Sequence, residues 1–210
     1  CAFLANGKTR DEVLVISTSI PTKIVSARNR NQLRKEAFML RKKFGLEQEK
    51  NFPIVEFIEL ILPQIDPDFE LVLEEDMDLP GRAAETIPEM HLIRVKQSIY
   101  DAACQGAYWP RTVMAHELGH YLCHAEENVT YAYPSVDKRL PNLYNAEKQA
   151  DIFSAELLAP IHLINEPSDY LVSKHFGVPK SIARIQINQA RKVQKRHQRM
   201  RAKRKQKGNG

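Results

Sequence analysis

The sequence predicts an α+β fold in which a small twisted sheet packs on a mainly helical body. Most of the chain has the apolar periodicity of helices, whereas segments typical of strands are few: residues 69–75 and 90–95, with weaker candidates at 13–17 and 23–26. With 210 residues, 43% of them hydrophobic, the chain is long enough to bury one good core. No apolar run approaches the roughly 20 residues that a membrane-spanning helix requires, so we expect no membrane partner.

Helical periodicity together with cap and stop residues predicts the helices in order. Residues 98–107 are expected to form a short helix or loop, and residues 125–145 a long connection of the kind that often borders an active site. A break is expected at Pro63, because proline has no backbone N–H to donate. The helices are predicted over residues 31–44, about 53–62, 110–124, 145–160 and 167–177, and from about residue 179 onward.

Residues 116–120 read His-Glu-Leu-Gly-His and are the most informative part of the chain. On a helix, His116 and His120 project from the same face, one turn apart. Two imidazoles so placed can bind one Zn²⁺, with Glu117 beside them as general base. Gly119 costs the helix about 1 kcal/mol relative to alanine. A residue this small would allow another backbone or a substrate to come close to the metal.

A catalytic zinc site uses three protein ligands and keeps one position open. Glu147 and Asp151 lie at i and i+4 on a predicted helix, and we assign Glu147 as the third ligand. Asp151 would accept a hydrogen bond from the far nitrogen of a ligand histidine. The alternative is two solvated acids, whose like charges cost the helix about 0.2–0.5 kcal/mol. Three other residues compete as ligands: Glu126, His124 and Glu156. For His124 we expect a local hydrogen bond, and for Glu156 a pairing with arginine or backbone.

Two motif blocks, at 93–124 and 147–160, resemble the ImmA/IrrE family of zinc metallopeptidase-like proteins. The family's helix reads AHELGHxxLH, and Cys123 replaces the usual leucine here. The second block, E-x-x-A-[ND]-x-F-A-x-E-L-L-x-P, is matched from Glu147 to Pro160, with Ser154 where alanine is usual. Residues 175–187 are similar to the family's closing F-x-V-S segment. The resemblance covers roughly residues 30–187, and only the two blocks are specific.

The resemblance implies a zincin-like fold with a gluzincin-like site: His116, His120 and Glu147 as metal ligands and Glu117 as base. Members are often tied to mobile elements and stress responses, where they cut helix-turn-helix repressors, many of them encoded nearby. This chain has no convincing helix-turn-helix of its own, so a separate repressor partner is implied. The chain is expected to comprise an N-terminal extension with short strands (1–28), the metallopeptidase-like domain (29–187) and a basic, partly disordered C-terminal helix or tail (188–210).

The net charge of +5 is distributed unevenly. Thirteen basic residues and no acidic one follow Asp169, which leaves 18 basic against 26 acidic residues in 1–169, a net charge of −8. Ten of those basic residues lie in 191–207 without an aromatic residue among them, which suits phosphate contact better than base stacking. A solvated extension is the alternative.

Three cysteines, Cys1, Cys104 and Cys123, are too few and odd in number for a disulfide framework and favour a cytoplasmic protein. A mature lipoprotein, which would also begin with cysteine, is the alternative.

These features predict a zinc-dependent endopeptidase, regulatory in role, that cleaves a protein substrate. Glu117 would take a proton from the attacking water and return it to the leaving amine. Two alternatives compete: a metal-bound regulator or sensor that does not cleave, and a nucleic-acid-binding protein acting through 191–207. The group that stabilises the oxyanion is left open among five residues: Tyr121, Tyr131, Tyr133, Tyr144 and Arg111.

Overall fold

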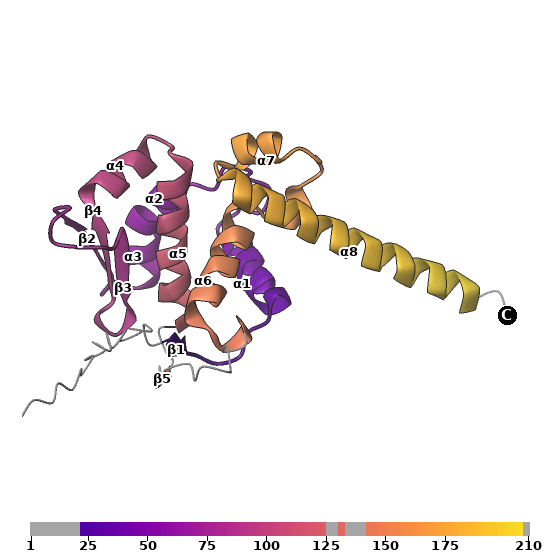
Figure 1. Ribbon diagram of the computed structural model, residues 1–210, viewed down its shortest axis with the longest axis horizontal. Helices are drawn as coiled ribbons and strands as arrows, with labels where there is room; N and C mark the ends of the chain where they lie inside the picture. Colours follow the sequence, from indigo (N-terminus) through magenta and orange to yellow (C-terminus); the bar gives the residue numbers. More distant parts are fainter. Residues whose placement is uncertain (1–21, 125–129, 133–141, 208–210) are drawn as a thin grey trace, which may run out of the picture.

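The computed structural model describes residues 22–124, 130–132 and 142–207. The central element is the long helix α5 (Tyr108–His124), which packs on a sheet on one side and on α6 (Ala146–Leu158) on the other. Helix α1 (Arg30–Lys43) packs in turn on α6 (Figure 1). The predicted α+β fold is therefore confirmed, and the arrangement is consistent with a zincin-like architecture.

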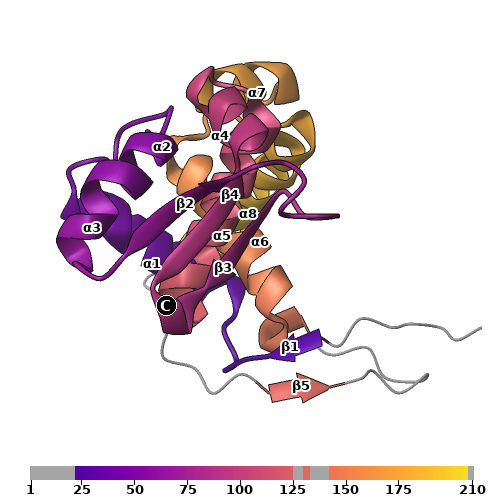
Figure 2. The ribbon, with the colours of Figure 1, turned by 90° about the vertical axis from the view of Figure 1, so that its left-hand side faces the viewer.

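The sheet beside α5 has three strands in the order β2–β4–β3 (Figure 2). Strands β2 (Glu70–Glu74) and β4 (Leu92–Lys96) are parallel and confirm the two predicted strands. Strand β3 (Ala84–Ile87) pairs antiparallel with β4 and was not predicted, because four residues after a turn are too short to show alternation. The buried side chains of Ile93 and Val95 on β4 belong to the same core as α5.

The remaining helices follow the predictions closely. Helix α1 begins with a capping box, in which the Asn29 side chain and Gln32 each bond the other's backbone N–H. Gly177, with φ of 62°, ends α7 in the left-handed conformation that glycine adopts without strain. The other bounds are α4 (Gln97–Cys104), α7 (Asp169–Phe176) and α8 (Lys180–Lys207), with 3₁₀ turns η2 (Pro88–Met90), η3 (Asn142–Tyr144) and η4 (Ile161–Leu163).

The expected break at Pro63 is wrong. Residues 54–65 form one helical run composed of α2 (Ile54–Glu56), the π-helical η1 (Phe57–Ile61) and α3 (Leu62–Ile65). The Leu62 N–H bonds to the Phe57 carbonyl, five residues back, immediately before the proline. A wider turn of this kind absorbs the missing hydrogen bond, so the helix continues for another turn.

Helices α5 and α6 approach most closely at Gly119. A Cβ atom built on Gly119 would lie 3.2 Å from the Cα of Ala150 and 3.3 Å from the Phe153 ring. The small residue between the two histidines therefore allows a neighbouring backbone to come close, as predicted. Glu147 and Asp151 lie close to Ala150 on α6. The close approach of Gly119 to Ala150 therefore brings both carboxylates near the histidines of α5.

Residues 22–28 pack against the helical layer. Strand β1 (Thr22–Ile24) pairs antiparallel with β5 (Thr130–Ala132), and Val25 is buried with its N–H bonded to the Tyr144 carbonyl at 3.0 Å. The strand predicted at 13–17 lies outside the described residues. The division at residues 28 and 187 stays a prediction.

Among the described residues, Cys104 is exposed and Cys123 is buried. Cys1 lies outside the described residues. Across the described part of the chain, no helix combines the length and apolar character needed to cross a membrane.

Candidate metal centre

Three side chains from two helices converge at the predicted site. His116 and His120 project from α5, and their Nε2 atoms lie 3.0 Å apart. Glu147, in the first turn of α6, places Oε2 at 3.3 Å from Nε2 of His116 and Oε1 at 3.4 Å from Nε2 of His120. All three offer a ligand atom within 4.8 Å of the others. The structure thus brings the three predicted ligands together.

The donor set fits a zinc ion. Nitrogen and oxygen ligands about 2.0–2.1 Å from a tetrahedral zinc lie about 3.3–3.4 Å from each other. The observed separations of 3.0, 3.3 and 3.4 Å are close to that value. Two imidazoles and one carboxylate also match the ligand types of catalytic zinc sites. The side chains of Glu147 and Asp151 are 59% and 49% exposed, yet each carboxylate lies beside a histidine of α5, which favours the metal site over two solvated acids.

Asp151 lies where the sequence placed it. Its Oδ1 is 3.2 Å from Nδ1 of His116, and its other oxygen accepts from Lys148 at 3.0 Å. Burial lowers the pKa of His116, but hydrogen bonds to Asp151 and Glu147 outweigh it and raise that pKa to about 10. The same bonds hold the pKa values of Glu147 and Asp151 below their usual range. In the absence of a cation, His116 is therefore protonated at neutral pH, and its positive charge lies beside the carboxylates of Glu147 and Asp151.

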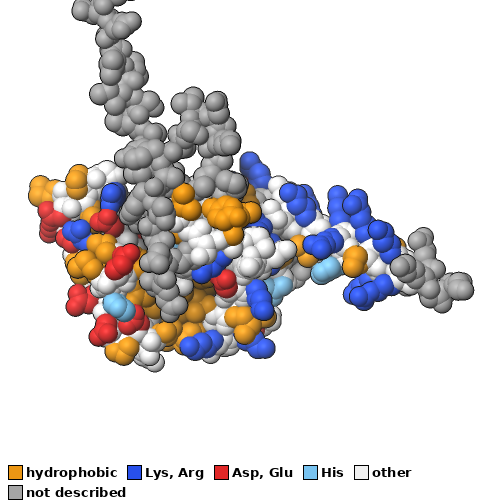
Figure 3. Space-filling view, turned by 90° about the horizontal axis from the view of Figure 1, so that it is seen from below, with side chains coloured by type: hydrophobic (Ala, Val, Ile, Leu, Met, Phe, Trp, Pro, Cys, Tyr) orange, Lys and Arg blue, Asp and Glu red, His pale blue; other side chains and the backbone are white. Residues whose placement is uncertain are grey.

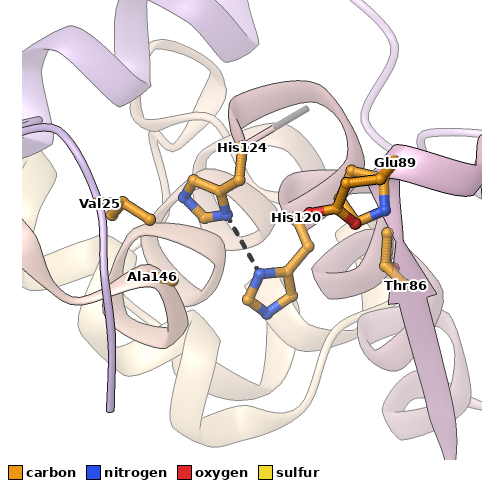
Figure 4. Close-up of a pocket in the computed structure, with 7 residues that line it drawn as sticks. Val25, Thr86, Glu89, His120, His124 and Ala146 are labelled. Carbon is orange, nitrogen blue, oxygen red and sulfur yellow. Dashed lines mark hydrogen bonds between the residues drawn. The ribbon is translucent and has the colours of Figure 1, made fainter. Parts of the chain in front are cut away.

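A second chain of hydrogen bonds reaches His120 through His124 (Figure 4). Gln149, fully buried on α6, donates through Nε2 to the carbonyls of Ser26 at 2.8 Å and Leu143 at 2.7 Å. Its Oε1 therefore faces His124 and accepts from Nε2–H at 3.2 Å. The Nδ1 atoms of His124 and His120 are 3.2 Å apart.

These bonds assign a tautomer to each ring. Burial lowers the pKa of His124 to about 4, so this ring is neutral and its Nδ1 is an acceptor. His120 then donates from Nδ1 and keeps the Nε2 lone pair free toward Glu147 and His116. The expected local hydrogen bond of His124 is confirmed. Gln149 was missed, because no pattern in the sequence links a helical glutamine to a carbonyl 123 residues away.

Glu117 points to the sheet side of α5. It is buried, and its Oε2 accepts a hydrogen bond of 2.7 Å from the hydroxyl of Thr86 on β3. The same hydroxyl lies 3.1 Å from the Glu117 carbonyl oxygen. Thr86 was also missed, since it belongs to the one strand of the sheet that was not predicted.

The competing acid Glu156 has a structural role. It is buried and accepts from Arg34 through both oxygens at 3.0 Å, and from Arg30 at 3.2 Å. The expected pairing with arginine is confirmed, and these contacts join α6 to α1 rather than to the histidines. Glu126 lies outside the described residues.

Two candidates for the oxyanion-stabilising group, Tyr121 and Arg111, already form hydrogen bonds with other groups. The Tyr121 hydroxyl donates to Asp66 at 2.5 Å, and Arg111 is buried against Asn51 and the Phe52 carbonyl at 2.7 and 2.8 Å. Tyr144, in η3 directly before the α6 cap, is exposed. The Tyr131 and Tyr133 side chains lie outside the described residues. Tyr144 is thus the described candidate that is not already held by a buried contact.

A small pocket of about 20 Å³, roughly the room that one water molecule needs, lies beside His120. Thr86 and Glu89 line it from the sheet side, and Val25, His124 and Ala146 from the helical side (Figure 4). The pocket therefore has room for one water molecule beside His120, next to strand β3, whose Thr86 binds Glu117.

The fold and this donor set are those expected of a metallopeptidase, and comparison with known proteins points to the same class. Residues 85–188 match the family model described as the IrrE N-terminal-like domain. Metallopeptidase ImmA of Bacillus subtilis (strain 168) is 31% identical over 84 residues, which cover 37% of this chain and 48% of that protein. The match thus spans about half the length of the curated relative. The chain is an ImmA/IrrE family protein, as its two motif blocks predicted.

Proposed function

We propose that this protein is a zinc-dependent endopeptidase with a regulatory role, and that its substrate is a protein such as a helix-turn-helix repressor encoded nearby. The observation that carries the proposal is the triangle of donor atoms from His116, His120 and Glu147. Glu117 on the same helix supplies a buried carboxylate held by a hydroxyl. The repressor as substrate rests on the family resemblance alone.

His116, His120 and Glu147 would hold the ion. A zinc ion bound there would polarise the peptide carbonyl and lower the pKa of water toward about 7. Asp151 fixes His116 with Nδ1 as donor, and the chain through His124 does the same for His120. Both rings therefore present Nε2 to the ion, and the protein does not have to reorganise them when it binds.

Glu117 would act as the general acid and base. Its carboxylate accepts a proton from the attacking water and returns it to the leaving amine. The hydrogen bond from Thr86 occupies Oε2 and leaves Oε1 free for that proton. Tyr144 is the candidate donor toward the developing oxyanion.

Metal content tests the ligand set. We expect about one zinc per chain in the purified wild-type protein, and loss of that zinc in His116→Ala and in Glu147→Ala. Asp169→Asn serves as the control, because Asp169 pairs only with Arg184 on the surface. Zinc retained at wild-type affinity in Glu147→Ala would remove Glu147 from the ligand set.

Cleavage is tested separately. The zinc-loaded protein and its Glu117→Gln variant are incubated with a proteome-derived peptide library and with purified helix-turn-helix repressors, and new N-termini are identified by mass spectrometry. We expect new termini with the wild type alone, at equal zinc content in both proteins. Zinc bound without any cleavage by the wild type would favour the non-cleaving regulator instead.

A further inference from the structure

The last helix, α8, packs on the body of the protein only as far as Ala190 and then projects away from it. Up to Ala190, α8 packs on the core through Ala183, Ile187 and Ala190, and Gln186 donates to the carbonyls of Ala155 and Ala159 at 3.1 and 2.9 Å. From Arg191 to Arg204 every side chain is exposed except Val193, which is half-buried. The helix therefore continues as a projecting rod (Figure 1). At 1.5 Å per residue, these residues extend about 21 Å.

The basic residues of this rod are not spread evenly around it. At 100° per residue, six of the eight basic residues between Arg191 and Arg204 fall within a sector of about 140°, and the middle of this sector points about 140° away from Ala183, Ile187 and Ala190. Arg201 and Arg204 lie outside the sector. None of the six forms an ion pair with any residue in the described part of the chain. We call this set the basic stripe: Arg191, Lys192, Lys195, Arg196, Arg199 and Lys203.

The charge pattern identifies the partner as a polyanion. No acidic residue follows Asp169, so the stripe has no neutralising charge on its own helix. Figure 3 shows Lys and Arg side chains along the projecting rod, whereas Asp and Glu side chains gather toward the sheet-bearing end. Six like charges on one helix face repel each other and destabilise an isolated helix. A partner with closely spaced negative charges would offset this repulsion and stabilise the helix.

The composition of the rod decides which polyanion fits. An anionic membrane would need an apolar face, but the rod offers only Val193, Met200 and Ala202. Single-stranded nucleic acid would need aromatic side chains for stacking, and 191–207 contains none. A helix 10–12 Å in diameter fits the major groove of B-form DNA, about 12 Å wide, whereas that of duplex RNA is too deep and narrow.

We propose that the basic stripe of α8 binds the phosphate backbone of double-stranded DNA without sequence preference. The stripe lies beyond residues 85–188, and the proposal does not depend on peptidase activity. Duplex DNA carries about one phosphate per 1.7 Å of axis, so a 21 Å rod meets enough phosphates to pair every residue of the stripe.

The test is the anisotropy of a labelled 30-base-pair DNA of arbitrary sequence, titrated with the full-length protein at 50, 100 and 200 mM salt. Each phosphate contact contributes about −0.9 to the slope of log affinity against log salt. Replacing four stripe residues by glutamine, in K192Q/K195Q/R196Q/R199Q, should make that slope shallower by about 3.6 and weaken binding at 50 mM salt more than tenfold.

The control removes the same charge from exposed lysines of the body, in K35Q/K42Q/K43Q/K174Q. We expect this variant to bind DNA within about threefold of wild type, and both variants to keep the wild-type circular dichroism spectrum. Equal losses in the two variants would show that net charge rather than the stripe attracts DNA, and would overturn the proposal. So would an absence of binding at 50 mM salt, or equal affinity for duplex RNA, poly-glutamate or anionic vesicles.

Discussion

The hydroxyl of Thr86 and the carboxylate of Glu117 lie 2.7 Å apart and join the edge strand β3 to the helix that carries both histidines. The hydroxyl donates and the carboxylate oxygen accepts. The bond also holds a side chain with three rotatable bonds in one orientation. The strand that the sequence did not predict therefore positions the predicted base.

Thr86→Val removes this hydroxyl while keeping the shape of the side chain. A hydrogen bond to a charged group contributes about 1.5–3 kcal/mol, so the cleavage rate should fall by about 10–100-fold. Zinc content should not change, because in the described part of the chain Thr86 makes no hydrogen bond to His116, His120 or Glu147. Thr86→Ser retains the hydroxyl and should recover most of the rate, measured on a peptide from the library above. A wild-type rate in Thr86→Val would contradict the positioning role.

Gln149→Leu should lower zinc affinity by about 10–100-fold, the usual effect of losing an outer-shell hydrogen bond. The substitution removes the acceptor that fixes the tautomers of His124 and His120. Competition with a zinc-binding dye measures the affinity.

Gln186→Leu provides a matched control for that variant. Gln186 is equally buried and also donates to two carbonyls, but it lies on α8 and contacts the C-terminal end of α6, away from the histidines. Both variants should lose about 1–3 kcal/mol of unfolding free energy, because each leaves buried polar groups without partners. Equal zinc affinity in the two variants would show that the Gln149 amide is only structural.

Glu156→Gln should destabilise the protein by about 1.5–3 kcal/mol, because it removes the charge from the hydrogen bonds to Arg30 and Arg34, which are only partly buried. Zinc stoichiometry in the folded fraction should stay at the wild-type value. Glu147→Gln should behave in the opposite way, with zinc lost and little change in the denaturant midpoint of the metal-free protein. Loss of zinc in folded Glu156→Gln would mean that the wrong acid is assigned as ligand.

Zinc binding should release protons at pH 8, and affinity should increase as the pH rises from 6.5 to 9. The pKa of His116 is raised to about 10 in the metal-free protein, so its ring is protonated throughout this range and must lose a proton to bind the ion. Calorimetry in buffers of different ionisation enthalpy counts the protons. Asp151→Asn removes one partner of His116 and should reduce both the proton release and the pH dependence. Affinity that does not change across this range would contradict the raised pKa.

The candidate ligands could be predicted because their spacing follows from local geometry. The i,i+4 spacing of His116 and His120 fixes their common face, and the same spacing of Glu147 and Asp151 places these two acids on one face of α6. Gly119 indicated a close backbone approach, which the contact with Ala150 confirms. Each of these inferences needs only the period of a helix.

The supporting residues could not be predicted, because their roles depend on contacts between distant parts of the chain. Thr86 acts through an antiparallel edge strand of four residues, and Gln149 through the Ser26 carbonyl, 123 residues away in the sequence. The helix through Pro63 depends on a π turn, which sequence periodicity does not reveal. In each case the partner is chosen by tertiary packing rather than by local propensity.

The contacts of α6 also bear on which fragments of the chain would be stable. A fragment restricted to residues 85–188 would lack Arg30 and Arg34, the partners of the Glu156 carboxylate. It would lack the Ser26 carbonyl as well, which leaves one Gln149 donor without its acceptor. We therefore expect a fragment that begins upstream of Ser26 to be more stable than one limited to the segment in which the family's motifs are found.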